Sequence, residues 1–77
     1  MKKDNIKING HVGTWYVIDE DERRGKKLYL LEHEYYGDEA ACLIIDEDYN
    51  VVMDDVWNGF DDYLEDWKIL FLIISIF

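Results

Sequence analysis

Four apolar stretches, each followed by a short polar segment, restrict the kind of fold that this 77-residue chain can form. β-Branched and aromatic side chains dominate them, as in β-strands, and the polar segments are short enough for hairpin turns. The stretches are residues 11–19, 26–34, 40–46 and 50–56. We therefore predict four antiparallel strands arranged as two hairpins. The connections between the strands are residues 20–25, 35–39 and 47–49.

The stretch at residues 26–34 shows how the side chains of one strand divide between two faces. Successive side chains of a strand point to opposite faces, so alternate residues share a face. The first face carries Tyr29, Leu31 and His33, and the second carries Leu28, Leu30 and Glu32. Both faces are rich in apolar side chains, which makes both of them candidates for the core.

The C-terminal third combines a helix-like pattern with a strand-like one. Asp62 followed by Glu65 resembles a helix cap, and large apolar side chains recur at spacings of three and four residues, as on an amphipathic helix. These side chains are Trp57, Phe60, Leu64, Trp67 and Phe71. The closing run ILFLIISIF, residues 69–77, suits a buried strand instead. We predict a short helix or turn at residues 58–66, followed by a fifth strand.

The predicted fold class is α+β, mainly antiparallel β, with a sheet of four to five strands. Residues 1–77 are expected to form a single small acidic domain, because a chain of this length is near the lower limit for a self-sufficient core. Hydrophobic residues make up 49% of the chain, far above the level of disordered proteins. The chain is therefore expected to fold.

The cellular compartment is inferred from the single cysteine and from the start of the sequence. Cys42 lies in the apolar run AACLII and cannot form an intramolecular disulfide, so we expect a buried small hydrophobic residue in a reducing compartment. No basic segment followed by a long apolar one opens the sequence, as a secretory signal would require. The closing apolar run is shorter than the roughly 20 residues that span a bilayer. We expect a cytoplasmic protein without membrane binding.

The charge is divided unevenly along the chain. Residues 1–27 carry seven Lys or Arg and five Asp or Glu, whereas residues 28–77 carry one base, Lys68, and thirteen acids. Such a surface repels the phosphates of DNA and RNA, which excludes direct nucleic-acid binding. It attracts basic proteins and speeds their association. The expected partner is therefore a basic protein, with nucleic-acid-binding nucleases as the natural class.

Two candidate metal sites fail on the spacing of their ligands. Asp46, Asp48 and Asn50 stand at the first three ligand positions of an EF-hand loop. Val51 stands where that loop requires glycine, and Trp57 stands where it requires a bidentate glutamate. The sequence therefore predicts a solvated hairpin turn and no calcium loop.

The histidines do not provide a metal site either. His11, His33 and Cys42 lack the paired spacing of a structural zinc site. His33 stands between Glu32 and Glu34 and is expected to be a surface residue whose protonated form these neighbours favour. We expect no metal and no cofactor.

No constellation for catalysis is evident. The hydroxyl and thiol nucleophiles are Thr14, Ser75 and Cys42, and the last two lie in apolar runs without an activating base. Carboxylates are abundant, but acid-base catalysis needs a cleft that a chain this small can hardly form. The five glycines form no phosphate-binding loop. We therefore predict that the protein is not an enzyme.

Binding is the remaining class, and residues 54–67 (DDVWNGFDDYLEDW) are its strongest signal. Trp57 and Phe60 flank the turn signal Asn58-Gly59, so their rings either cap the core or form a contact surface with an acidic rim. Acids on alternate strand residues lie about 6.7 Å apart, close to twice the roughly 3.4 Å phosphate spacing of DNA. We predict these partner-binding residues: Asp46, Asp48, Asp54, Asp55, Trp57, Phe60, Asp61, Asp62 and Glu65.

A resemblance to a known family adds a biological setting. The run LLEHEYYGDEA through DDVWNGFDD, within residues 28–62, resembles a large polyvalent protein-associated domain found in proteins of conjugative and phage-like elements of gut Firmicutes. The resemblance implies an accessory protein of a mobile element and transfers no catalytic residues. The apolar ending after Lys68 is not part of this pattern.

Two hypotheses of function follow from this setting. Mobile elements must survive host defence, so the first is an acidic inhibitor that imitates nucleic acid and occupies a CRISPR or restriction nuclease, as an anti-CRISPR or antirestriction protein does. The alternative is a structural or adaptor module that self-associates as a homodimer or docks on a larger element-encoded protein through its C-terminal apolar segment. The self-association residues would be Ile69, Phe71, Ile73 and Phe77.

Overall fold

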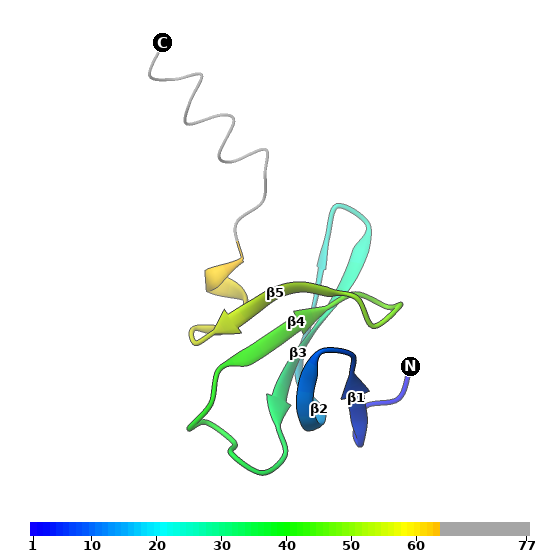
Figure 1. Ribbon diagram of the computed structural model, residues 1–77. Coiled ribbons are helices and arrows are strands. Elements are labelled where there is room, and N and C mark those ends of the chain that lie inside the picture. Colours follow the sequence, from blue (N-terminus) through cyan, green and yellow to red (C-terminus); the bar gives the residue numbers. More distant parts are fainter. Residues whose placement is uncertain (64–77) are drawn as a thin grey trace.

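A computed structural model describes residues 1–63, which form one antiparallel sheet of five strands and a short 3-10 helix. The strands lie side by side in the order in which they occur along the chain (Figure 1). This order makes the sheet a meander. The elements are β1 (Ile6–Ile8), β2 (His11–Arg23), β3 (Lys26–His33), β4 (Cys42–Ile45), β5 (Val51–Val56) and the 3-10 helix η1 (Gly59–Asp62).

The β2–β3 hairpin is longer than the sequence indicated. β2 continues to Arg23, which pairs with Lys26, so the predicted connection at residues 20–25 shrinks to a two-residue turn. The turn residues Arg24 and Gly25 have φ angles of 53° and 77°. Positive φ at both central residues defines the type I′ turn, whose twist matches that of the flanking strands. This tight turn allows the charged residues 20–23 to pair with β3 as part of strand β2.

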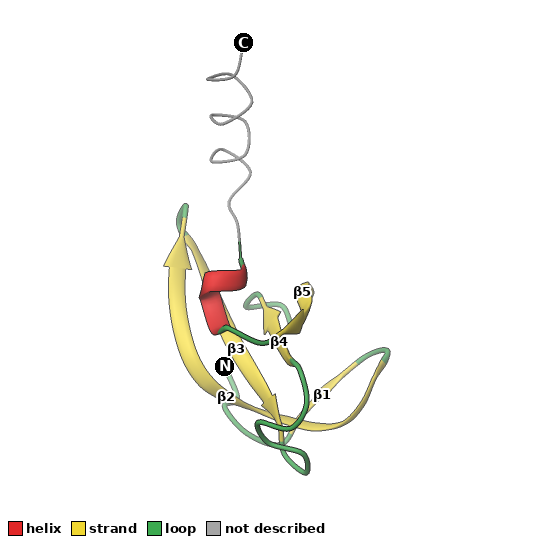
Figure 2. Ribbon diagram, turned by 90° about the vertical axis from the view of Figure 1, so that its left-hand side faces the viewer, coloured by secondary structure: helices red, strands yellow, loops and turns green. Residues whose placement is uncertain are grey.

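The first core cluster lies on one face of the sheet. The strand β2 bends along its length, as Figure 2 shows, and its register with β3 shifts between Val17 and Asp19, where a bulge lies. Bulges increase strand bending, and the bend brings β1 and the start of β2 over this face. The cluster consists of Ile6, Ile8, Trp15, Tyr29, Leu31, Leu43 and Ile45, with Val17 and Val51 packed against it.

The second core cluster lies on the opposite face of β3 and β4. Leu28 and Leu30 alternate with Tyr29 and Leu31, which confirms the division predicted for this strand. The residues of η1 and its C-cap pack against this second cluster. It consists of Leu28, Leu30, Ile44 and Val56, together with partly buried Cys42, Met53, Phe60 and Tyr63. Apolar side chains on both faces of one sheet explain the high hydrophobic content of so short a chain.

Two parts of the predicted fold need correction. The α+β class is not confirmed, because residues 1–63 contain no α-helix and only the 3-10 helix at Gly59–Asp62 falls within the predicted segment 58–66. A fifth strand is present in the described part, but it is β1 at the N-terminus, closed by the Asn9-Gly10 turn. The helix-like stripe beyond Tyr63 and the strand predicted at residues 69–77 lie outside the described residues.

His33 is buried, which corrects the prediction of a surface histidine. Its ring lies against Gly13, where an added Cβ would come within 2.1 Å of Nε2. Nε2 lies 3.1 Å from the Val12 carbonyl oxygen, and Nδ1 accepts hydrogen bonds from the backbone N–H groups of Tyr35 (3.1 Å) and Tyr36 (3.3 Å). Since Nδ1 accepts, the ring proton is on Nε2, which donates to Val12. In the sequence, the flanking residues Glu32 and Glu34 indicated an exposed histidine.

We expect Gly13→Ala to destabilise the fold more than Gly10→Ala does. Both glycines have positive φ, 97° and 85°, so each substitution adds left-handed strain of about 1–2 kcal/mol. Only at Gly13 does the new methyl group collide with the His33 ring, whereas nothing lies within 4 Å at Gly10. Urea unfolding is expected to give a loss of roughly 2–4 kcal/mol for Gly13→Ala. Equal losses in the two variants would contradict the contact.

Candidate functional site

The corner between β5 and η1 presents a large aromatic ring to solvent. β5 ends at Val56, which is buried, and the next side chain, Trp57, is 58% exposed. The Trp57 indole N–H donates a 3.0 Å hydrogen bond to Asp55 Oδ1. This bond fixes the orientation of the ring without burying it.

Asp62 holds this corner together from the other side. Its Oδ2 accepts hydrogen bonds from the backbone N–H groups of Trp57 (2.9 Å) and Asn58 (3.0 Å), and its Oδ1 accepts one from the Asn58 side-chain amide (3.1 Å). These bonds favour the charged carboxylate, so the Trp57 and Asn58 N–H groups hold the pKa of Asp62 below its ordinary value of 3.8. Asp62 is therefore a structural residue of the corner.

The two aromatic rings at the turn have different surroundings. Phe60 is half-buried and packs against the second core cluster, so its ring caps the core. Trp57 is exposed. Gly59 adopts a φ of 63°, and a Cβ there would be 3.6 Å from Leu30 Cδ2. The tight turn at Asn58-Gly59 thus sends one ring to the core and leaves the other in solvent.

Among residues 1–63, the strand that leads into this corner lies at the edge of the sheet and has an irregular register. β5 is the last strand of the sheet, and its pairing jumps from Ile44↔Met53 to Cys42↔Val56. Asp54 and Asp55 form the bulge in between, with Asp55 at a φ of 54°. Bulges and charges on an edge strand discourage pairing with another chain. Both acids are exposed beside Trp57.

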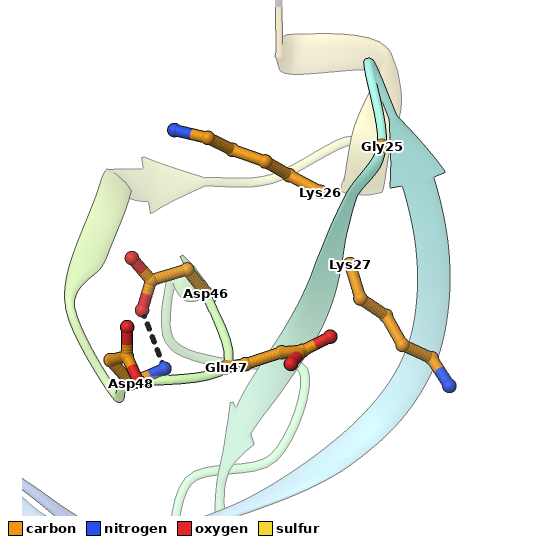
Figure 3. Close-up of a pocket in the computed structure, with 6 residues that line it drawn as sticks. All are labelled: Gly25, Lys26, Lys27, Asp46, Glu47 and Asp48. Atoms are coloured by element: carbon orange, nitrogen blue, oxygen red, sulfur yellow. Dashed lines mark hydrogen bonds between the residues drawn. The ribbon is translucent and has the colours of Figure 1, made fainter.

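Asp46 and Asp48 lie at the opposite end of the sheet from Trp57. They belong to the β4–β5 loop, which faces Lys26 and Lys27 of the β2–β3 hairpin across a hollow of about 260 Å³ (Figure 3). The two lysines project to opposite sides of β3. The predicted contact residues therefore fall into two groups, one beside lysines at this end and one around Trp57 at the other.

Asp46 is used by the loop itself. Its Oδ1 accepts hydrogen bonds from the backbone N–H groups of Asp48 and Asn50, both at 2.9 Å, and its Oδ2 accepts one from the Asn50 amide (3.2 Å). Partial burial works against ionisation, yet these bonds and the nearby Lys26 ammonium lower the pKa of Asp46 overall. The sequence predicted a hairpin turn here in place of a calcium loop, and Asp46 closes that turn through its hydrogen bonds.

The predicted contact acids also differ in whether their side chains form hydrogen bonds within the fold. Asp46, Asp55 and Asp62 hold hydrogen bonds within the fold. The side chains of Asp48, Asp54 and Asp61 have no hydrogen-bond partner or ion pair among residues 1–63, and all three are exposed. Only this second set is available for a partner without loosening the fold. Glu65 and the predicted self-association residues Ile69, Phe71, Ile73 and Phe77 lie outside the described residues.

Sequence analysis missed a second exposed aromatic site, in the β3–β4 connection. Tyr35 is 83% exposed and Tyr36 is 53% exposed. Their rings meet edge to face at 4.9 Å, and Tyr36 also lies 5.0 Å from the His33 ring. The signal in the sequence was a pair of adjacent tyrosines inside an otherwise polar hairpin connection, where no core requires them.

The remaining chemistry of the described residues is limited. Cys42 is half-buried against the second core cluster, and burial together with the nearby Glu32 raises the pKa of its thiol. Between residues 1 and 63, no three His, Cys, Asp or Glu side chains are close enough to hold a metal ion. In the same part of the chain, no helix has the length and apolar character needed to cross a membrane.

The sequence profile of the family described as large polyvalent protein-associated domain 18 matches residues 1–69. The chain belongs to this family. The match confirms the resemblance seen at residues 28–62 and extends it over all five strands and η1, which lie within the matched region. No curated protein and no solved structure matches the chain.

We expect Asp62→Ala to lower the thermal midpoint, whereas Asp61→Ala leaves it nearly unchanged. Both variants remove one negative charge from η1, but only Asp62 accepts hydrogen bonds from the Trp57–Asn58 backbone. A carboxyl whose pKa is lowered by folding stabilises the fold above its ordinary value of 3.8 and loses this contribution as the pH falls toward its folded value.

The difference in thermal midpoint between wild type and Asp62→Ala should therefore have its full size at pH 6 and become smaller toward pH 3. Thermal unfolding followed by circular dichroism at both pH values measures it. A pH-independent difference, or an equal loss in Asp61→Ala, would show that Asp62 does not act through its charged form.

Proposed function

We propose that this domain is a non-enzymatic protein-binding module of a mobile genetic element, and that it inhibits a host DNA-targeting defence protein such as a CRISPR or restriction nuclease. The observation that carries the proposal is the Trp57 corner. There Asp55 orients an exposed indole, and the exposed acids Asp54 and Asp61, three and four residues away in sequence, have no hydrogen-bond partner or ion pair among residues 1–63.

The charge around the corner supports a basic partner. Residues 28–63, which include the corner, carry eleven Asp or Glu and no Lys or Arg, so this part of the chain is strongly negative; Arg23 of β2 lies over the Tyr63 ring at the end of η1. A surface of one sign steers a partner of the opposite sign and raises the association rate. An exposed tryptophan supplies the apolar contact that charge alone lacks, since Trp is enriched among residues that carry most of the binding energy.

Inhibition would follow from competition for one surface. The DNA-binding channel of a nuclease is lined by Lys and Arg that neutralise phosphates. An acidic domain that occupies those side chains excludes the DNA and needs no chemistry of its own. The domain itself would bind neither nucleic acid nor membrane, would need no cofactor, and would act in the cytoplasm.

Charge reversal at Asp54 and Asp61 is the test. We expect Asp54→Lys/Asp61→Lys to weaken binding to the partner at least about tenfold, because each change replaces an attraction by a repulsion. Trp57→Ala should weaken binding by a similar factor. The matched control is Asp4→Lys, an exposed position near the N-terminus outside the predicted contact residues, which is expected to change binding little. Immobilised protein would capture partners from a bacterial lysate at low and high salt, and DNA cleavage by each captured nuclease would be measured with and without the domain.

Three results would contradict the proposal. They are captured nucleases whose DNA cleavage the domain does not slow, binding that does not weaken with salt, and an effect of Asp4→Lys equal to that of the double variant. Asp55 and Asp62 are left unchanged because their hydrogen bonds maintain the corner.

A second candidate function is favoured by the family description, which associates these domains with large polyvalent proteins. In this alternative the domain is an adaptor that forms a homodimer or docks on a larger element-encoded protein through its C-terminal apolar segment. Deleting residues 69–77 is then expected to convert an assembly to monomers in size-exclusion light scattering, while charge-dependent binding persists. A wild-type protein that is already monomeric and binds no element-encoded protein would contradict this alternative.

A further inference from the structure

We propose that a hollow between the start of β2 and the end of β3 binds an arginine side chain of a protein partner. This inference deepens the proposed function: it rests on a basic protein as the source of the arginine, and it names a contact separate from the Trp57 corner. The hollow measures about 380 Å³ and is lined by Gly13, Thr14, His33, Glu34 and Tyr35.

The two exposed side chains of the hollow have complementary chemistry for a guanidinium group. Glu34 offers an exposed carboxylate, which forms no ion pair within residues 1–63. Tyr35 is 83% exposed and offers the face of a ring. Arginine pairs with carboxylates through its N–H groups and stacks on aromatic faces, whereas lysine acts mainly as a point charge. The pair therefore selects arginine.

The base of the hollow is held rigidly by the fold. His33 accepts the Tyr35 and Tyr36 N–H groups at Nδ1, and its Nε2 lies 3.1 Å from the Val12 carbonyl oxygen. The Trp15 ring meets the His33 ring edge to face at 4.9 Å. An aromatic side chain that is exposed but carried by a fixed backbone loses little freedom on binding, which favours affinity.

The backbone around the hollow is also tied to the sheet. The Glu34 N–H donates to the Thr14 carbonyl oxygen (2.8 Å), and the Gly37 N–H donates to the His33 carbonyl oxygen (2.9 Å). The absence of a side chain at Gly13 leaves the space in which His33 lies, since a Cβ there would collide with the ring. The hollow thus depends on the same Gly13–His33 contact as the fold.

The charges near the hollow favour a cation over an anion. Residues 32–39 contain four Asp or Glu and no Lys or Arg, and one of the four acids, Glu34, lines the hollow. The opposing charge is Lys7, whose Nζ lies 3.5 Å from the Thr14 hydroxyl at the edge of the hollow. Removing this ammonium should strengthen the binding of a cation. A nucleotide stacked on Tyr35 would bring phosphate against the Glu34 carboxylate, which disfavours nucleic acid as the occupant.

The test is a titration of the ¹⁵N-labelled protein with Nα-acetyl-arginine amide, followed by amide chemical shifts. Nα-acetyl-citrulline amide has nearly the same shape without the charge and serves as the control ligand. We expect saturable shifts at Gly13, Glu34, Tyr35 and Tyr36 with the arginine probe and none with the citrulline probe. The corresponding lysine probe should bind more weakly.

Variants then assign the contacts. Tyr35→Ala and Glu34→Gln should each weaken binding about two- to fivefold, as expected for an exposed cation–π contact and an exposed ion pair. Lys7→Ala should tighten it. Glu47→Gln removes the same charge as Glu34→Gln at the other end of the sheet and should leave binding unchanged. The exposed position of Tyr35 keeps the fold intact in its variant.

The inference is overturned if the shifts do not saturate, if the citrulline probe produces the same shifts, or if Glu47→Gln weakens binding as much as Glu34→Gln does. The titration uses no partner protein. Its failure would therefore leave the inhibitor proposal standing, and the failure of nuclease capture would leave an arginine site without a known source.

Discussion

The contact between the His33 ring and Gly13 is the constraint on which one end of the molecule depends. The ring occupies the place of a missing side chain on β2, and its two nitrogens bind the backbone of β2 and of the β3–β4 connection. It therefore joins the second strand, the third strand and the tyrosine-bearing connection in one unit. The first core cluster reaches this unit through Trp15, whose ring lies against His33.

The acidic residues divide into those that build turns and those that face solvent. Asp46 closes the β4–β5 loop, while Asp55 and Asp62 hold the Trp57 corner. A carboxylate is well suited to short turns because it accepts several backbone N–H groups at once. The acidic composition is therefore partly structural, and the proposed recognition of a partner falls to carboxylates outside these turns.

Much of the sheet could be predicted from the sequence, because the strand signals were local. The alternation at residues 26–34 and the Asn58-Gly59 turn are properties of neighbouring residues, and both are confirmed. The burial of His33 could not be predicted, since it depends on a glycine twenty residues away that only strand pairing brings near. The extension of β2 to Arg23 was missed because charged residues are rare in strands, and a type I′ turn at Arg24-Gly25 overrides that preference. The exposed tyrosines were missed because aromatic residues are usually assigned to the core.

The agreement between strand order and chain order has a kinetic consequence. Each strand pairs with its immediate neighbour in sequence, and the β2–β3 hairpin closes over a loop of only two residues. Contacts between residues close in sequence cost little loop entropy, and proteins rich in them fold quickly. The hairpin can form as soon as its second strand has been synthesised, with β4 and β5 added in turn. Each new strand then covers the edge left by the strand before it, without waiting for a segment far along the chain.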